Sequence, residues 1–164
     1  GYGLSSHTTG VLLTGAMLLP MSLVPFLGRI PGHYPRARKP MGLGLAWTVT
    51  LVWLGVVLWP GGLPPLPVIA GVILVSAFAS VLAPSISFDY ARDGLPEQRT
   101  GAASGLVNMS GFTSVMLGVV GAGIVLDLGL SFQAAFVPMT LLCLVASTAM
   151  TLLLRNRRSR AAKK

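Results

Sequence analysis

The sequence predicts an all-α fold, a polytopic bundle of five helices that cross a lipid bilayer. Apolar residues make up 53% of the 164 residues, charged residues only 10%, and the mean hydropathy is +0.77. Soluble domains carry roughly 25% charged residues, so this composition excludes an ordinary soluble domain. The apolar residues also gather in five long runs, and one spanning helix needs about 20 such residues.

The five apolar runs define a transmembrane region over residues 1–154 and a basic tail over 155–164. The predicted spans are 8–30, 41–59, 67–88, 101–126 and 132–154. Prolines interrupt three of them, with Pro20 and Pro25 in the first, Pro84 in the third and Pro138 in the fifth. Neighbouring helices in a membrane can satisfy the carbonyls that proline frees. We therefore expect a kink near residues 19–24 of the first run and a bend in the last turn of the third, rather than helix ends.

The fourth run is rich in glycine, which would argue against a helix in water. In lipid, small residues allow two helices to approach closely, and Gly101 and Gly105 have the spacing of such a contact. The glycines of this run are Gly101, Gly105, Gly111, Gly118, Gly121 and Gly123. The pattern predicts a closely packed helix without identifying its partner.

The basic residues predict the orientation of the chain, because they mark the cytoplasmic side of short loops. They are Arg29, Arg36, Arg38, Lys39, Arg92, Arg99, Arg155, Arg157, Arg158, Arg160, Lys163 and Lys164. All of them fall at alternate connections or in the tail, and connections 60–67 and 127–131 have none. We expect the N-terminus outside and the C-terminus cytoplasmic, in the plasma (inner) membrane. Arg36, Arg38, Lys39 and Arg99 are the candidate cytoplasmic-loop residues.

This topology also explains the net charge of +8, so no nucleic-acid partner is expected. No carboxylate, base or histidine lies in the middle of a run, where it would indicate a functional site. The sequence has no zinc-ligand spacing, phosphate loop or nucleophile elbow. His7 and His33 flank the first run and are expected to be solvated. We therefore expect neither catalysis nor a cofactor nor a metal site.

Neutral polar side chains remain as candidates for a pathway or for helix packing. Ser76 and Ser80 are four residues apart on the third run, and Ser104 and Asn108 are four apart on the fourth, so each pair shares a helix face. An asparagine in hydrocarbon needs a partner on another helix or water in a cavity. Asn108 therefore either lines a polar pathway or forms a hydrogen bond across a helix interface.

Three further segments carry a resemblance to a known family. Residues 96–108 read Pro-Glu-Gln-Arg-Thr-Gly-Ala-Ala-Ser-Gly-Leu-Val-Asn and lead into the glycine-rich run, which closes in Leu126-Asp127. Residues 1–5 read Gly-Tyr-Gly-Leu-Ser and are followed by Thr9-Gly10, and residues 36–40 read Arg-Ala-Arg-Lys-Pro. In this order and orientation, the chain resembles the second half of a major facilitator superfamily transporter.

The resemblance implies that the five runs correspond to helices eight to twelve of a twelve-helix protein. The third run would line the central cavity, the first and fourth would face the other half, and the second and fifth would be peripheral. The two halves of such a protein rock around a site near the midplane. The segment Gly28-Arg29-Ile30-Pro31 lacks the aspartate of the family's loop signature, so that loop's gating salt bridge is not carried over.

The resulting hypothesis is part of a secondary active transporter that moves a small solute by alternating access. The partners would be the bilayer, missing N-terminal helices of the same protein and an unknown small-molecule substrate. Five helices cannot enclose a pathway, so this portion is not expected to transport alone. One alternative is a small membrane scaffold or subunit that packs through its glycine-rich helix. A small dimeric multidrug-type transporter would require a membrane-embedded carboxylate, which the sequence lacks.

Overall fold

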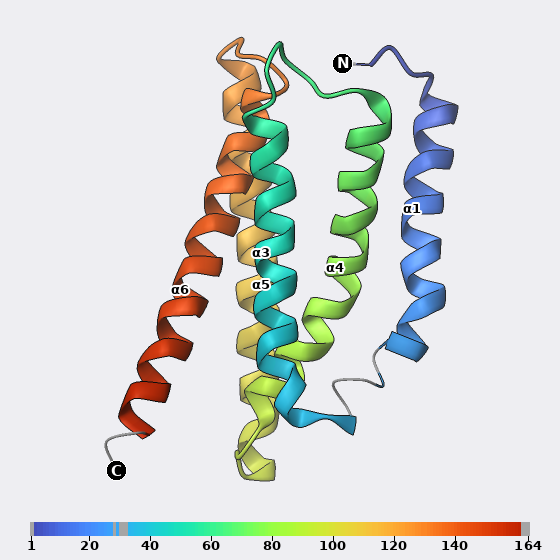
Figure 1. Ribbon diagram of the computed structural model, residues 1–164. Helices are drawn as coiled ribbons and strands as arrows, with labels where there is room; N and C mark the ends of the chain where they lie inside the picture. The colour runs from blue at the N-terminus through green and yellow to red at the C-terminus, as the bar shows by residue number, and fades with distance from the viewer. Residues whose placement is uncertain (1, 28, 30–32, 162–164) are drawn as a thin grey trace.

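The computed structural model describes residues 2–27, 29 and 33–161, and within them every regular element is helical. The elements are α1 (Ser6–Leu27), the 3-10 helix η1 (Pro35–Ala37), α3 (Arg38–Val57), α4 (Leu66–Arg92), α5 (Glu97–Asp127), the 3-10 helix η2 (Ala134–Phe136) and α6 (Val137–Ala161). Figure 1 shows the five long helices side by side with their axes roughly aligned, and successive helices run in opposite directions.

The lengths and compositions of these helices confirm a polytopic membrane bundle. In the described part of the chain, Arg38–Val57, Leu66–Arg92, Glu97–Asp127 and Ala134–Arg155 are long and apolar enough to cross a membrane. The 22 residues of α1 rise about 33 Å at 1.5 Å each, which also matches the hydrocarbon core. Pro20 and Pro25 lie inside α1 and Pro84 lies inside α4, so these prolines do not end the helices.

The helices extend beyond the predicted apolar runs at their charged ends. The third run continues as α4 to Arg92, and α5 begins at Glu97, so only residues 93–96 connect them. An acidic residue is favourable in the first turn of a helix and a basic residue in the last turn. Glu97 and Arg92 occupy these positions, respectively. Residues 155–161 of the predicted tail belong to α6.

The fifth run forms its α-helix later than the sequence pattern predicts. Helix α6 begins at Val137, after η2, so Pro138 lies in the first turn of the α-helix. The N–H groups of a first turn have no partner within the helix, and proline is well tolerated there. Pro138 therefore stands at the start of the α-helix.

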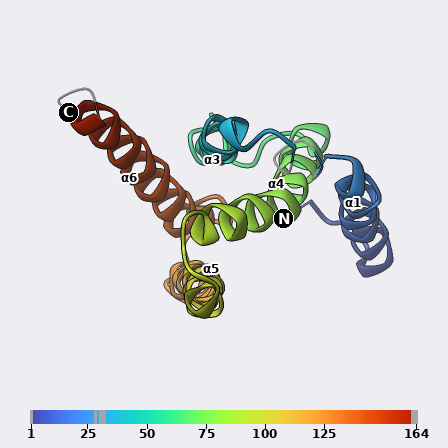
Figure 2. The ribbon, with the colours of Figure 1, turned by 90° about the horizontal axis from the view of Figure 1, so that it is seen from below.

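Helix α4 occupies the middle of the arrangement. It packs against α1, α3 and α5, while α6 packs against α3 and α5. Viewed from below, α3 and α6 lie to one side of α4, and α1 and α5 lie to the other (Figure 2). The lower part of α4 turns toward α5. Pro84 lies in this helix and has no N–H to donate to the carbonyl of Ser80, which favours a bend.

The apolar core lies between α3, α4 and the start of α6. Trp53, Val56, Ile69 and Val72 are buried, and partly buried side chains including Phe136 and Met139 pack on them. The rings of Trp53 and Phe136 are 4.9 Å apart between centroids. Side chains from α3, η2 and α6 thus meet around one tryptophan.

Two side-chain hydrogen bonds join α3 to α6. The hydroxyl oxygens of Thr50 and Ser147 are 2.8 Å apart, and both residues are buried. The Trp47 indole donates to Thr151 Oγ1 at 3.0 Å. A polar group inside a membrane needs a hydrogen-bond partner. These two pairs therefore fix the register of α3 against α6.

Gly121 marks a close approach of α5 to α6. A Cβ placed there would lie 2.8 Å from the Pro138 Cβ, a distance that real contacts do not reach. The proline ring is rigid, so the helices would have to separate. Gly55 on α3 offers a contrast, because a Cβ placed there would have nothing within 4 Å.

We expect Gly121→Ala to destabilise the protein by about 1–3 kcal/mol, because overpacking forces backbone shifts. Gly55→Ala should be neutral or slightly stabilising, since alanine favours helix. The measurement is the thermal unfolding midpoint of each purified variant in detergent. Equal midpoints for the two variants would contradict the close contact.

Gln133 closes the C-terminal end of α3. Its side-chain amide nitrogen lies 3.0 Å from the carbonyl oxygen of Val56 and 2.9 Å from those of Val57 and Trp59. The last carbonyls of a helix have no partner within the helix. The amide of Gln133 supplies donors to them and ties the α5–α6 connection to α3.

We expect Gln133→Glu to lower the unfolding free energy by about 1–3 kcal/mol, because a carboxylate cannot donate to these partly buried carbonyls. Gln98→Glu is the matched control, since Gln98 is exposed in the first turn of α5. A negative charge there is compatible with the helix dipole. Thermal unfolding that is equally affected by both changes would exclude the capping role.

Candidate functional site

Ser76 lies at the interface of α3 and α4 and is half-buried. Its hydroxyl donates to the Val72 carbonyl at 2.8 Å and accepts a hydrogen bond from the Trp53 indole at 2.9 Å. The sequence pattern alone does not identify Trp53 as its partner. In this structure the Ser76 hydroxyl is occupied in joining two helices.

Ser80 has a different environment, although it lies one turn further along α4. Its hydroxyl donates to the Ala77 carbonyl at 2.8 Å, and the residue is exposed. The lone pairs of the hydroxyl oxygen therefore remain available on the surface of α4. The two serines of this predicted pair do not act as one site.

Ser104 joins α5 to the end of α4. Its hydroxyl donates to the Thr100 carbonyl at 2.8 Å and accepts a hydrogen bond from Arg92 Nε, also at 2.8 Å. The guanidinium group of Arg92 additionally lies over the Phe88 ring, 5.7 Å from its centroid. Ser104 thus belongs to the charged end of the molecule as well as to the glycine-rich helix.

Asn108 lies on an exposed face of α5. Its side chain makes no hydrogen bond to the described part of the chain. Gly101 and Gly105 share this side of the helix, and a Cβ at either position would meet nothing within 4 Å. The described residues therefore provide no cross-helix partner for Asn108.

A continuous stripe extends from these residues along α5, and we call it the open face of α5. The spacing alternates four and three residues, which keeps its members on one side of a helix. It comprises Gly101, Gly105, Asn108, Phe112, Val115 and Val119. The three large members are 66%, 62% and 66% exposed, respectively, so the described helices leave the stripe uncovered.

The packed side of α5 contrasts with its open face. A Cβ on Gly118 would lie 3.9 Å from Met139, an ordinary contact, and Gly121 approaches Pro138. The glycines of the fourth run therefore divide into two sets. Gly118 and Gly121 pack within the chain, whereas a Cβ at any of the other four would meet nothing within 4 Å, namely at Gly101, Gly105, Gly111 and Gly123.

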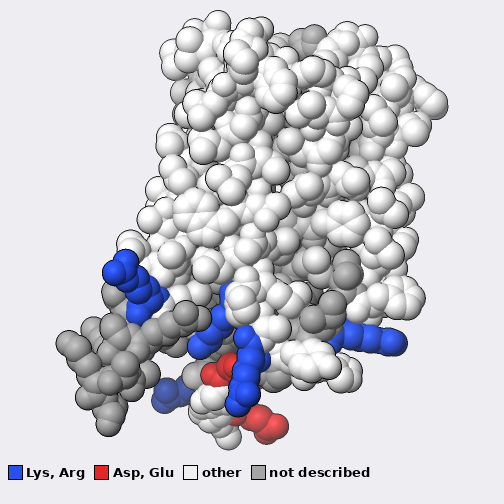
Figure 3. Space-filling model, viewed as in Figure 1, with Lys and Arg blue, Asp and Glu red and all other residues white. Residues whose placement is uncertain are grey.

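Basic and acidic side chains gather at the end of the bundle where α3 begins and α4 ends (Figure 3). The Arg38 side chain is 14% exposed and lies 3.7 Å from Asp89 and 3.5 Å from Asp93. The ammonium group of Lys39 lies over the Tyr90 ring, 5.6 Å from its centroid. These contacts join the start of α3 to the end of α4.

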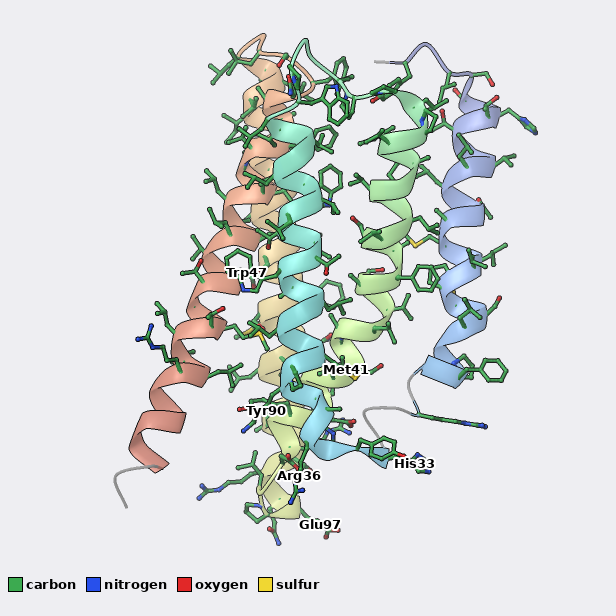
Figure 4. All side chains as sticks on the ribbon, in the orientation of Figure 1. His33, Arg36, Met41, Trp47, Tyr90 and Glu97 are labelled. Atoms are coloured by element: carbon green, nitrogen blue, oxygen red, sulfur yellow. The ribbon has the colours of Figure 1, made fainter. Side chains whose placement is uncertain are left out.

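The other two candidate loop residues are exposed. Arg36 lies in η1 and Arg99 in the first turn of α5, and neither forms an ion pair within the described residues. Figure 4 shows Arg36, Tyr90 and Glu97 toward the same end of the bundle. Asp89 and Asp93 are partners of Arg38 that were not predicted from the sequence. Their spacing of four residues, at the end of a helical run, was the available signal.

The whole length of the chain is similar to one family of membrane proteins. The family model described as Major Facilitator Superfamily matches residues 1–164. The chain belongs to the major facilitator superfamily. No curated protein and no solved structure matched the chain.

Membership confirms the resemblance drawn from the sequence and makes this chain an integral membrane protein of a transporter superfamily. Its members are transporters rather than enzymes, which agrees with the expectation for this chain.

We expect Arg38 and Asp89 to be coupled by about 0.2–1 kcal/mol, the range for partly exposed ion pairs. A double-mutant cycle with Arg38→Gln and Asp89→Asn measures this coupling as a change in thermal stability. It should shrink at high salt, which screens exposed charges. The cycle of Arg36→Gln with Asp89→Asn is the control and should give no coupling. Equal values in both cycles would exclude a specific pair.

Proposed function

We propose that this chain is the C-terminal part of a secondary active transporter that moves a small solute by alternating access. The open face of α5 carries this proposal. It combines Gly101, Gly105 and Asn108 on one uncovered stripe of a helix that has the length and apolarity of a membrane span. An uncovered asparagine in hydrocarbon is unfavourable. A facing helix, or water in a central cavity, would remove that cost.

In this proposal, α1, α3, α4, α5 and α6 are helices eight to twelve of the transporter. Helix α4 lines the central cavity, α1 and α5 face the other half, and α3 and α6 are peripheral. The position of α4 between α1 and α5 on one side and α3 and α6 on the other supports this assignment (Figure 2). The remaining helices would be the partner that covers α5.

The proposed orientation has the N-terminus outside and the C-terminus in the cytoplasm, in the plasma membrane. The gathering of described basic side chains at one end supports it, since short basic loops stay on the cytoplasmic side (Figure 3). Arg36, Arg38, Lys39 and Arg99 would then be cytoplasmic.

Asn108 and Ser80 are the proposed pathway-facing groups, because both are exposed. Ser76 and Ser104 are proposed as helix-packing residues. The Ser76 hydroxyl accepts a hydrogen bond from α3, and the Ser104 hydroxyl accepts one from the end of α4. A pathway lined by hydroxyl and amide groups would select its solute by hydrogen bonding and shape. The substrate itself is an unidentified small molecule.

The alternative function is a membrane scaffold or subunit without transport. The same uncovered glycines favour it, because small residues permit a partner helix to pack closely. The coding sequence immediately upstream distinguishes the two functions. Seven further spans in the same reading frame support the transporter. A start codon directly before Gly1 overturns it in favour of the scaffold.

We expect Asn108→Ala in the intact transporter to lower solute uptake severalfold at unchanged membrane expression, because a pathway-facing amide is lost. Uptake is measured in vesicles with a solute identified from a substrate panel. Ser110→Ala is the matched control, since the Ser110 hydroxyl donates to the Val107 carbonyl of its own helix. Reduced expression with normal uptake per molecule would assign Asn108 to helix packing instead.

A further inference from the structure

The end of the bundle opposite the charged one is formed by two apolar connections. Residues 58–65 join α3 to α4, and residues 128–133 join α5 to η2. In the view of Figure 3, Lys, Arg, Asp and Glu appear only toward the other end of the molecule. The large apolar side chains of the two connections are more than half exposed at Leu58, Leu128, Leu130 and Phe132. We call these two connections the apolar end.

The first connection has paired much of its own backbone. Prolines at three positions have no N–H that needs a partner, at 60, 64 and 65. The N–H groups of Leu58 and Trp59 donate to carbonyls of the last turn of α3, at 2.9 and 3.3 Å. The Tyr2 hydroxyl donates to the Pro64 carbonyl. A connection in water needs none of these partners, because water would supply them.

The second connection closes the end of α5 in a similar way. Gly129 has a positive φ of 73°, and its N–H donates to the Leu126 carbonyl at 2.9 Å. The N–H of Leu130 donates to the Val125 carbonyl at 3.3 Å. These two bonds form a Schellman motif, which satisfies carbonyls that the helix end leaves unpaired. The side chains that the motif presents outward are nevertheless leucines, where a loop in water would carry polar residues.

The length of α3 decides the depth of the apolar end. Helix α3 has 20 residues, and Arg38 and Lys39 are the first two. The rest of the helix rises about 27 Å at 1.5 Å per residue, whereas the hydrocarbon core is about 30 Å thick. With its charged start at the headgroups of one leaflet, α3 ends before it reaches the opposite boundary, and any tilt shortens its reach further. The connection that follows must therefore complete the crossing.

Gln133 brings the second connection to the same depth as the first. Its amide nitrogen lies within 3.0 Å of the carbonyl oxygens of Val56, Val57 and Trp59. Leu128, Leu130 and Phe132 belong to the same short segment as Gln133. The exposed side chains of both connections therefore lie in one layer.

Two observations limit how deep this layer lies. Asp127 ends α5 beside the second connection and is exposed, and a carboxylate is unfavourable in hydrocarbon. Within the two connections, the N–H groups without a partner in the described chain belong to residues 61–63 and 131–133. These groups need water, which the headgroup region contains. The layer therefore lies at the boundary between the acyl chains and the headgroups.

We propose that the apolar end inserts into the membrane leaflet opposite the charged end. Leu58, Leu128, Leu130 and Phe132 lie among the first segments of the acyl chains. Trp59 lies at the level that tryptophan favours, where its ring contacts lipid and its N–H reaches the headgroups. The partner is the bilayer itself. This inference depends on membrane insertion of the helices and not on the proposed transport function.

The test measures the depth of a nitroxide label on the intact protein in liposomes. Leu58→Cys and Leu130→Cys are made separately in a background without other cysteines, Cys143→Ala included. Gln98→Cys is the water reference, because Gln98 is exposed at the charged end. Val145→Cys is the lipid reference, because Val145 is exposed on α6, a membrane-spanning helix. Each label is exposed to oxygen, which concentrates in lipid, and to a nickel chelate, which stays in water.

We expect the ratio of oxygen to nickel accessibility at Leu58 and at Leu130 to exceed that at Gln98 severalfold and to stay below that at Val145. A ratio equal to that of Gln98 at either site would place the connection in water and overturn the proposal. Low accessibility to both reagents would show that another protein segment covers this end, which would also overturn it.

A second measurement needs no substitution. The unmodified protein is reconstituted with a lipid that carries a diazirine near the glycerol end of its acyl chain, or with one that carries it at the chain terminus. After irradiation, mass spectrometry locates the labelled residues. We expect the first lipid to label residues 58–65 and 128–133 severalfold more than the second. Equal labelling by the two lipids, or no labelling of these residues, would contradict insertion at the boundary.

Discussion

A lipid interior supplies no hydrogen-bond partner, and this constraint decides where the polar groups of the protein lie. The described hydroxyls of α4 and α5 illustrate it, because Ser76, Ser80, Ser104, Ser110 and Ser114 each donate to a carbonyl of their own helix. Where a second polar group is within reach, it joins a neighbouring helix, as Trp53 does through Ser76. Hydrogen bonding therefore contributes to the contacts between helices as well as to the helices themselves.

The same constraint explains why α3 has so many specific contacts. Thr50 and Trp47 reach α6, Trp53 reaches α4, and Gln133 supplies donors to the carbonyls at the helix end. Apolar packing alone is weakly specific in lipid, because lipid tails are as apolar as leucine. The polar pairs add directionality. They hold α3, α4 and α6 in one register around Trp53.

The sequence was sufficient to predict the class of fold, because hydropathy and alternating basic connections depend only on local composition. It also predicted from the glycines that α5 packs closely, without separating Gly121 from Gly101. That separation depends on which helix lies opposite, and periodicity does not contain this information. The same reason applies to Ser76, whose partner lies on α3, and to Gln133, which is an ordinary polar residue in a connecting segment.

The helix ends were harder to predict for another physical reason. Hydropathy reports where the hydrocarbon ends, whereas backbone hydrogen bonding continues into the headgroup region. Asp89 and Asp93 were consequently assigned to a loop between two runs. Asp89 instead continues α4, Asp93 caps its end, and both lie beside Arg38. Because Asp89 and Asp93 are four residues apart at the end of α4, the helix places both carboxylates on the side that faces Arg38.

Pro84 has a mechanical consequence for α4. Its ring nitrogen has no hydrogen, so the helix lacks the backbone hydrogen bond from residue 84 to the Ser80 carbonyl. Flexing the helix at this point breaks no hydrogen bond, so α4 is more compliant there than along the rest of its length. The segment below that point carries Asp89, and through Arg38 it is attached to the start of α3. A small tilt of this segment would therefore change the distance between Asp89 and Arg38, and the contact between the end of α4 and the start of α3 would respond to a bend at Pro84.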